Sequence, residues 1–322
     1  MVTVLTKGGV YKTNPVRIEE FLVSPRYVGK MLVWESVKED LIALLSDKTP
    51  FNRGLLVEPP GAGKTTLGGL FLMWCLYLLA NLRDPQGHFG LDQSTSIGVM
   101  NMSISSRTAS GTLYSKLRKM LIASPWFQEY CRVDQSVQSE IRLPDPLFAF
   151  SGNSSESFPA GYDIFGAVVD EVTMFLNKSH KGAYSDQVKN IFEVLEERTE
   201  SRFMGEGYVL AMGASSYTND FVTEMEKEAD EYGDILVIRR PLWYALPRTK
   251  FSGRYFLFDT DKMKIVPNSE SEGLFTPENK QEIMEQIKAG LSIVPKPTVN
   301  RPAVSDTLSQ KTGKQLMKIT AV

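Results

Sequence analysis

A short apolar segment, a glycine-containing loop and a long apolar helix follow one another near the start of this chain. This succession constrains the fold more than any other feature. The segment is Gly54–Glu58 (GLLVE), the loop is PPGAGKTT at 59–66, and the apolar run continues to Ala80. Because turn residues bound the first segment, it predicts a buried strand. A strand that enters a glycine loop with Gly-Lys-Thr opening a helix is the context that a phosphate-binding loop requires.

Each residue type in this loop has a chemical use. Glycines let backbone N–H groups turn inward around phosphate oxygens, and the start of the helix adds positive potential there. The Lys64 ammonium can reach the β- and γ-phosphates, and the Thr65 hydroxyl can ligate Mg²⁺. The nucleotide-binding residues expected here are Gly61, Ala62, Gly63, Lys64, Thr65 and Thr66.

One residue departs from the usual pattern G-x-x-x-x-G-K-[ST]. Glu58 stands where the first glycine belongs. The Gly-Lys-Thr core at a strand-to-helix junction is unchanged by this departure. The alternative is an ordinary glycine-rich turn before a helix.

A second apolar strand, Ile164–Asp170, ends in two consecutive carboxylates, Asp170 and Glu171. We expect Asp170 to hold Mg²⁺ through a water and Glu171 to polarise the attacking water as a general base. The alternative is a solvated acidic pair at the end of a strand. Together with the Gly-Lys-Thr loop, the pair predicts ATP hydrolysis by an activated water.

Two further groups of polar residues are weaker candidates. Ser215 and Ser216 follow the strand Gly207–Ala214, and Ser215 is expected to sense the γ-phosphate unless it belongs to a serine-rich turn. Arg198 and Arg202 are four residues apart on a predicted helix, so they share a face. Either can stabilise phosphate charge; the alternative is surface ion pairing with the neighbouring glutamates.

Two aromatic residues that precede the loop have two possible roles. Tyr27 or Trp34 can stack on adenine, but an aromatic side chain in a helix is more often part of the core.

The remaining strands alternate with helical segments. Strands are expected at Ser96–Ser105 and Asp234–Arg239 in addition to those above. This alternation predicts an α/β fold with a mostly parallel sheet covered by helices on both faces. A further strand between the two motifs, Ser96–Ser105, is typical of the P-loop NTPase class with an additional strand and a catalytic glutamate.

Composition excludes several classes of protein. Lys and Arg number 36 against 38 Asp and Glu, a net charge of −2, which argues against a strongly basic nucleic-acid binder but leaves room for a local basic stripe. Two cysteines and two widely separated histidines make a zinc site improbable. The apolar run Leu67–Ala80 is shorter than the ~20 residues that a spanning helix needs, so we expect a buried core helix and no membrane association.

The expected organisation has three parts. Residues 1–50 form an N-terminal helical segment on the adenine side, and 51–250 form the ATPase core. Residues 251–322 form a linker and mobile tail, since the segment from Pro295 is rich in Pro, Ser, Thr and Lys.

The order of these motifs resembles the ATPase domain of the large terminase subunit of tailed bacteriophages. The likeness covers about Phe21 to Leu246 and rests on PPGAGKTT, SISSRTASGTLYSKLRKMLIASPWF, FPAGYDIFGAVVDEVTMF, LEERTESRF and MGASS. It implies a motor that uses ATP and Mg²⁺ to drive double-stranded DNA into a preformed capsid in the host cytoplasm. It also implies a homo-oligomeric ring docked on a portal protein, with a small terminase subunit as partner.

Two departures from that family bear on function. Many terminases place an arginine before the second-motif strand, and Ser157–Gly161 contains none. The cluster of aspartates typical of their nuclease domain is also missing after Lys250, so nuclease activity is not expected from this chain. The alternatives are another nucleic-acid-dependent ATPase, such as a helicase or translocase, and a nucleotide-dependent scaffold with little turnover.

Overall fold

The computed structural model describes residues 9–103, 110–137, 140–153, 162–172, 186–214, 221–259, 264–265, 271–272 and 291–297. The chain forms two compact units. The first comprises Met1–Ser215 with Asn219–Arg240, and the second comprises Ser216–Thr218 with Pro241–Val322. Both the glycine loop and the carboxylate pair belong to the first unit.

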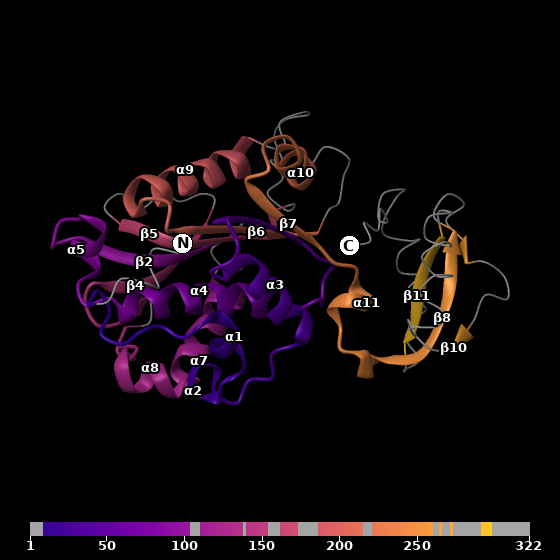
Figure 1. Cartoon of the computed structure of the whole chain (residues 1–322), viewed down its shortest axis with the longest axis horizontal. Helices are drawn as coiled ribbons and strands as arrows, with labels where there is room; N and C mark the ends of the chain where they lie inside the picture. The colour runs from indigo at the N-terminus through magenta and orange to yellow at the C-terminus, as the bar shows by residue number, and fades with distance from the viewer. Residues whose placement is uncertain are drawn as a thin grey trace. The chain divides into compact units, whose positions relative to one another are not determined.

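A sheet of seven strands forms the centre of the first unit (Figure 1). In sheet order the strands are β3 (Ile141–Arg142), β4 (Leu147–Asn153), β2 (Ser96–Ser103), β5 (Tyr162–Asp170), β6 (Tyr208–Gly213), β1 (Arg53–Val57) and β7 (Ile235–Arg239). Neighbouring strands are parallel, except that β3 runs antiparallel to β4. The mostly parallel sheet predicted from the sequence is confirmed, although β3 and β4 were not anticipated.

The strand that separates β1 from β5 in the sheet is β6. Ser96–Ser105, which lies between the two motifs along the chain, occupies another place in the sheet. In the structure β2 pairs with β5 on the side away from β6, whereas β6 pairs with both β5 and β1. The predicted strand is present as β2, and the strand inserted between β1 and β5 in the sheet is β6, because order along the chain does not give order in the sheet.

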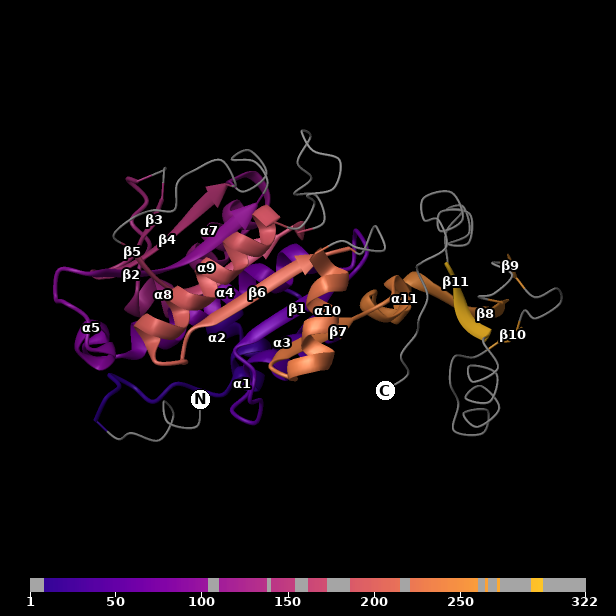
Figure 2. The ribbon, with the colours of Figure 1, turned by 90° about the horizontal axis from the view of Figure 1, so that it is seen from above.

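Helices cover both faces of the sheet, as Figures 1 and 2 show. One face carries α9 (Asp186–Phe203) and α10 (Phe221–Tyr232). The other carries α4 (Lys64–Asn81) with α1 (Ile18–Val23), α2 (Pro25–Val28), α3 (Glu35–Leu45), α7 (Ser115–Ala123) and α8 (Pro125–Tyr130). Each face encloses its own apolar cluster.

α4 is apolar around its whole circumference because other elements surround it. Every residue from Leu67 to Asn81 is buried. Trp74 and Tyr77 lie against the ring of Phe21 at centroid distances of 5.1 Å. The prediction of a buried core helix is confirmed. Among the residues that the structure describes, no helix is both long and apolar enough to cross a membrane.

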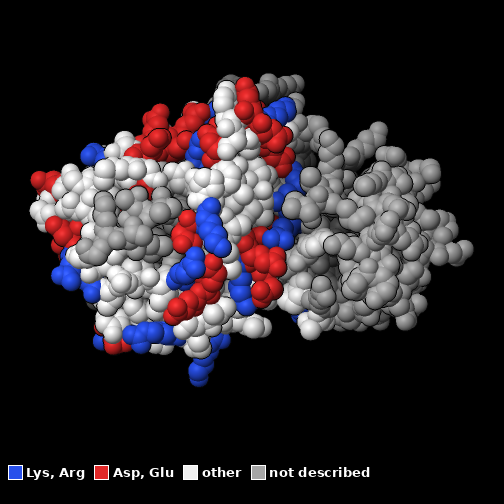
Figure 3. Space-filling view, viewed as in Figure 1, with Lys and Arg blue, Asp and Glu red and all other residues white. Residues whose placement is uncertain are grey.

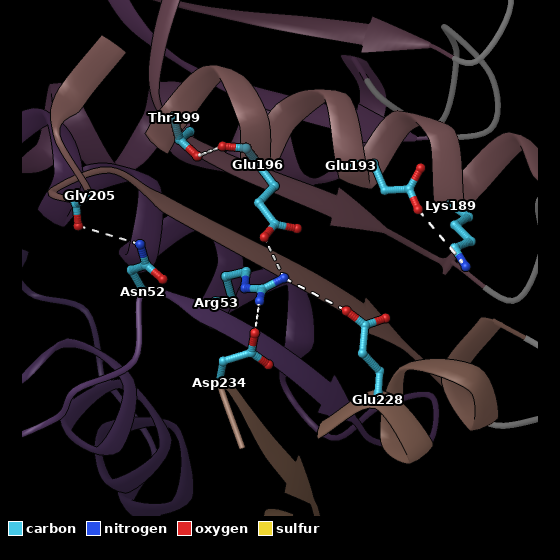
Figure 4. A network of polar contacts seen from close by, with 9 residues as sticks. All are labelled: Asn52, Arg53, Lys189, Glu193, Glu196, Thr199, Gly205, Glu228 and Asp234. Carbon is cyan, nitrogen blue, oxygen red and sulfur yellow. Dashed lines mark hydrogen bonds and ion pairs between the residues drawn. The ribbon is translucent and has the colours of Figure 1, made fainter. Parts of the chain in front are cut away.

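An ion-pair network ties the helices of one face to the edge where β1 begins (Figure 4). Arg53 pairs with Glu196 of α9, with Glu228 of α10 at 3.9 Å, and with Asp234 just before β7. The Arg53 side chain is only 14% exposed. This edge lies opposite the one at which β1 enters the glycine loop, so the network positions the scaffold and takes no part in the site.

The second unit contains a small antiparallel sheet. Its strands are β8 (Phe251–Asp259), β9 (Lys264–Ile265), β10 (Ser271–Glu272) and β11 (Leu291–Pro297). We expected 251–322 to be linker and tail, and its described part differs from that expectation. The reason is composition: β8 is rich in aromatic residues, which favour strands. The domain limits at 50 and 250 stay a prediction.

Candidate functional site

The glycine loop joins the end of β1 to the start of α4. Gly61 and Gly63 both have positive φ, 86° and 112°. A Cβ on Gly63 would lie 3.2 Å from Cγ2 of Val37 in α3. Both the backbone conformation and the close approach of α3 therefore require glycine at 63. The N–H of Thr66 donates to the carbonyl of Gly63 at 2.8 Å, which leaves the N–H groups of Lys64 and Thr65, at the start of α4, available to an anion.

Lys64, the first residue of α4, lies at the centre of this loop. Its Nζ donates to the carbonyl oxygens of Glu58 at 2.7 Å and of Pro59 at 3.0 Å. Burial lowers the pKa of Lys64, while the negative charges of Glu58, Asp170 and Glu171 act in the opposite direction. The ammonium therefore lies within electrostatic reach of the carboxylate pair at the end of β5. The structure brings the two motifs together across β6.

The carboxylate pair is held in a specific local geometry. Asp170 is 6% exposed, and its Oδ1 accepts a hydrogen bond of 2.9 Å from the backbone N–H of Glu171. Burial, reinforced by the neighbouring Glu171, raises the pKa of Asp170 to about 6. Glu171 has φ 57°, a left-handed conformation that is strained for a residue with a side chain. Such strain clusters at functional sites.

The donor set at this edge suits a hard cation. Asp170 offers a buried carboxylate and Thr65 a hydroxyl, and Mg²⁺ binds to proteins through one or two carboxylates together with substrate phosphates. Asp170 has no ion-pair partner among the described residues. A carboxylate with a pKa raised by burial gains most from a bound cation. The chemistry of these residues suits Mg²⁺, and the metal site stays a prediction.

A buried acidic pair lies beside the loop, and the sequence did not reveal it. Glu58 and Asp40 of α3 are 2% and 1% exposed, and Oε2 of Glu58 and Oδ2 of Asp40 have no hydrogen-bond partner among the described residues. Burial and the charge of Asp40 raise the pKa of Glu58 to about 7. Arg240, which follows β7, donates to Oδ1 of Asp40 at 2.6 Å.

A lysine from α7 also approaches the loop. Nζ of Lys116 donates to Oγ1 of Thr66, in the first turn of α4. The sequence gave no signal for this contact, because Lys116 stands in the mixed segment SKLRKM, which simply predicts an amphipathic helix.

The two predicted arginines lie at the other edge of the sheet. Nε of Arg202 is 3.3 Å from Oδ1 of Asp163, near the start of β5, whereas Asp170 ends that strand. At ~3.3 Å per residue, roughly 20 Å of strand separates them. α9 runs antiparallel to β5, so Arg198, one turn earlier, is also carried away from the Gly-Lys-Thr loop of its own chain. The structure thus brings together Lys64, Asp170 and Glu171 but neither arginine.

The aromatic candidates separate clearly. Tyr27 is buried in the core and stacks on Phe21 with ring centroids 5.3 Å apart. The Trp34 ring instead borders the loop, 3.5 Å from the position of a Cβ on Gly63. Trp34 is therefore the aromatic residue nearer the nucleotide loop. Ser215 lies outside the described residues.

Comparisons with known proteins agree with this architecture. A family model described as the N-terminal P-loop domain of the uncharacterised protein MJ0330 matches residues 4–263. No curated protein matches. The HK97 bacteriophage large terminase has a similar structure, with a TM-score of 0.50 and 14% identity over 69% of this chain and 43% of that chain. This chain thus spans less than half of that terminase, and the likeness shows a shared fold.

Two further structures show weaker likeness. The large terminase of a thermophilic bacteriophage has a TM-score of 0.43 and 10% identity, over 65% of this chain and 46% of that one. The N-terminal domain of the DNA packaging ATPase of bacteriophage phi29 has a TM-score of 0.37 and 12% identity, over 59% of this chain and 91% of that one. The resemblance to terminases predicted from the motifs is confirmed at the level of the fold.

Proposed function

This chain belongs to the family of the MJ0330 N-terminal P-loop domain, and on that premise we propose that it binds and hydrolyses ATP. The observation that carries the proposal is the strand order: β6 alone separates β1, which leads into the Gly-Lys-Thr loop, from β5, which ends in Asp170, and the three strands are parallel. A cation on a phosphate-binding loop facing a carboxylate pair supplies both halves of an ATP-hydrolysing site.

The residues of the loop would bind the phosphate chain. N–H groups from Gly61 to Thr66 would donate to its oxygens, and those of Ala62 and Thr66 would exchange the carbonyls of Pro59 and Gly63 for them. Lys64 would exchange its two carbonyl acceptors for the β- and γ-phosphates. Thr65 and Asp170 would hold Mg²⁺, which when bound neutralises charge on the phosphate oxygens.

Glu171 would act as the general base. Its carboxylate would take the proton of the attacking water as the new bond to the γ-phosphorus forms, while the bond from that phosphorus to the bridging oxygen breaks and ADP leaves. The left-handed backbone at Glu171 and its N–H bond to Asp170 fix this residue relative to the end of β5. The preorganised position is what makes the base effective.

The test separates binding from hydrolysis. Glu171→Gln should bind ATP with parental affinity but lose ~10²-fold or more in turnover, because it removes the base and spares the loop. Lys64→Ala should lose both. Glu200→Gln, an exposed carboxylate on α9, is the matched control and should hydrolyse at the parental rate. Parental turnover by Glu171→Gln would refute the assignment.

For the biological role we propose a packaging motor that moves double-stranded viral DNA into a capsid in the host cytoplasm. The terminase-like fold supports this role, with a portal protein, a small terminase subunit and further copies of this chain in a ring as partners. The alternatives are a helicase or other translocase and a scaffold with little turnover. Stimulation of the ATPase by blunt duplex DNA, without strand separation, favours the motor; no stimulation by any DNA favours the scaffold.

The charge distribution restricts where DNA can bind. The outer face formed by α9 and α10 is acidic (Figure 3), with Glu193, Glu197, Glu200, Glu224, Glu231 and Asp230. Because DNA binding depends on neutralising phosphates with Lys and Arg, this face would repel the duplex. We therefore assign DNA contact to other surfaces of the chain.

A further inference from the structure

Lys116 combines partial burial with a lack of negative partners. Its side chain is half-buried, and burial alone lowers the pKa of its ammonium. Among the described residues, no carboxylate lies within ion-pair distance of Nζ, and the neutral hydroxyl of Thr66 is its acceptor. Removing an ammonium from water without a counter-charge is costly. An anion that binds beside Thr66 would offset that cost.

Docking of α7 does not explain the position of this lysine. Apolar contacts already fix α7 and the turn before it on α4: Leu113 lies against Gly68, and Met120 lies against Gly69, each within 3.0 Å of a Cβ placed there. Apolar packing therefore holds α7 on α4, and an aliphatic residue at position 116 would pack there equally well.

The position also distinguishes Lys116 from Lys64. Lys64 donates to the carbonyls of Glu58 and Pro59 within the loop, whereas Lys116 donates to Thr66, two residues further into α4. The backbone of such a loop surrounds the α- and β-phosphates, while its lysine reaches the β- and γ-phosphates. Thr66 belongs to the first turn of α4, where N–H groups face the phosphates.

From this juxtaposition, and resting on the proposed ATP site, we propose that Lys116 is a second phosphate-binding cation, supplied by α7, that contacts the α- or β-phosphate of a bound nucleotide. In binding, Nζ exchanges the Thr66 hydroxyl for a phosphate oxygen or donates to both. ADP and ATP are bound alike by this contact, because neither phosphate is lost on hydrolysis.

The test measures nucleotide affinity rather than turnover. Lys116→Met keeps the methylene chain and removes the charge, and it should weaken both ADP and a non-hydrolysable ATP analogue by about tenfold or more, the size of a charge-assisted hydrogen bond. Lys116→Arg should keep most of the affinity. Lys119→Met, an exposed lysine on the same helix, is the matched control and should bind as the parent does.

The outcomes separate this inference from the proposed function. A parental chain that binds no nucleotide would overturn both. A parental chain that binds ADP, with Lys116→Met binding equally well at an unchanged Tm, would overturn only the role of Lys116. A lower Tm with unchanged affinity would show a packing role and likewise overturn it. Loss of affinity at an unchanged Tm, restored by arginine, supports the inference.

Discussion

Glu58 replaces the usual first glycine of the phosphate-binding loop with a buried acid, and its substitution by glutamine should make the protein more stable at alkaline pH. The Glu58 carboxyl is 2% exposed, close to Asp40, and its pKa is raised from 4.5 to about 7. Glutamine has nearly the same shape and never ionises. Glu58→Gln therefore removes the cost of a buried charge while keeping the contacts of the side chain.

The sign and size of this effect on stability follow from the ordinary pKa of Glu58 and its raised pKa in the folded protein. A carboxyl whose pKa is higher in the folded state binds its proton more tightly there, so ionisation above pH 4.5 opposes folding. The cost grows from pH 4.5 to pH 7 and then stays constant. At about 1.4 kcal/mol for each pH unit, it reaches roughly 3 kcal/mol above pH 7.

Urea unfolding at pH 5 and pH 8 measures the effect. We expect Glu58→Gln to exceed the parent in unfolding free energy by roughly 2.5 kcal/mol more at pH 8 than at pH 5. Glu20→Gln, an exposed acid on α1, should show no such difference. If Glu58→Gln loses stability equally at both pH values, the carboxyl contributes through hydrogen bonds instead, and the reasoning from burial is wrong.

Three other changes test the loop and its surroundings. Gly63→Ala should destabilise the protein by ~1 kcal/mol or more and weaken ADP binding, because φ is 112° and the new Cβ approaches Val37. Thermal unfolding measures the loss of stability, and titration with ADP measures the loss of affinity. Gly90→Ala, at φ 69° with no atom near the new Cβ, is the control for backbone strain alone. Arg240→Ala should lower the free energy of unfolding by roughly 3 kcal/mol, since it leaves the buried Asp40 carboxylate without its cation. Adding Asp40→Asn to the same chain should recover part of that loss, as measured by urea unfolding. Arg202→Ala should leave the ATP turnover within one chain unchanged. If the arginine acts on a neighbouring copy, a mixture of Arg202→Ala and Glu171→Gln proteins should hydrolyse ATP faster than either variant alone. A mixture whose rate is the sum of the two separate rates would leave Arg202 as the surface partner of Asp163.

The parts of the site that could be predicted from the sequence are those formed by residues that are contiguous along the chain. The strand, the glycine loop and Lys64 are contiguous, and the apolar strand before Asp170 fixes which end of β5 carries the acids. The place of Arg202 follows from the length of the helix that carries it. α9 has 18 residues, about 27 Å of helix, which is long enough to return the chain to the opposite edge of the sheet.

Other features depend on contacts between distant segments. Asp40 is buried because Arg240, 200 residues later, reaches α3, and no periodicity within the helix signals that partner. Lys116 meets Thr66 only because α7 packs on α4. The place of β6 between β1 and β5 is likewise a matter of sheet order, which the sequence of strands along the chain leaves open.

The position of β6 sets the distance between the phosphate-binding loop and the carboxylate pair. Adjacent strands lie about 4.8 Å apart, so one intervening strand sets the ends of β1 and β5 roughly 10 Å from each other. That span accommodates a chain of phosphates and a water between the loop and Glu171. Main-chain hydrogen bonds, and not side chains, maintain this spacing. Apolar replacements within Tyr208–Gly213 should therefore alter how much protein folds while leaving the turnover of each folded molecule unchanged.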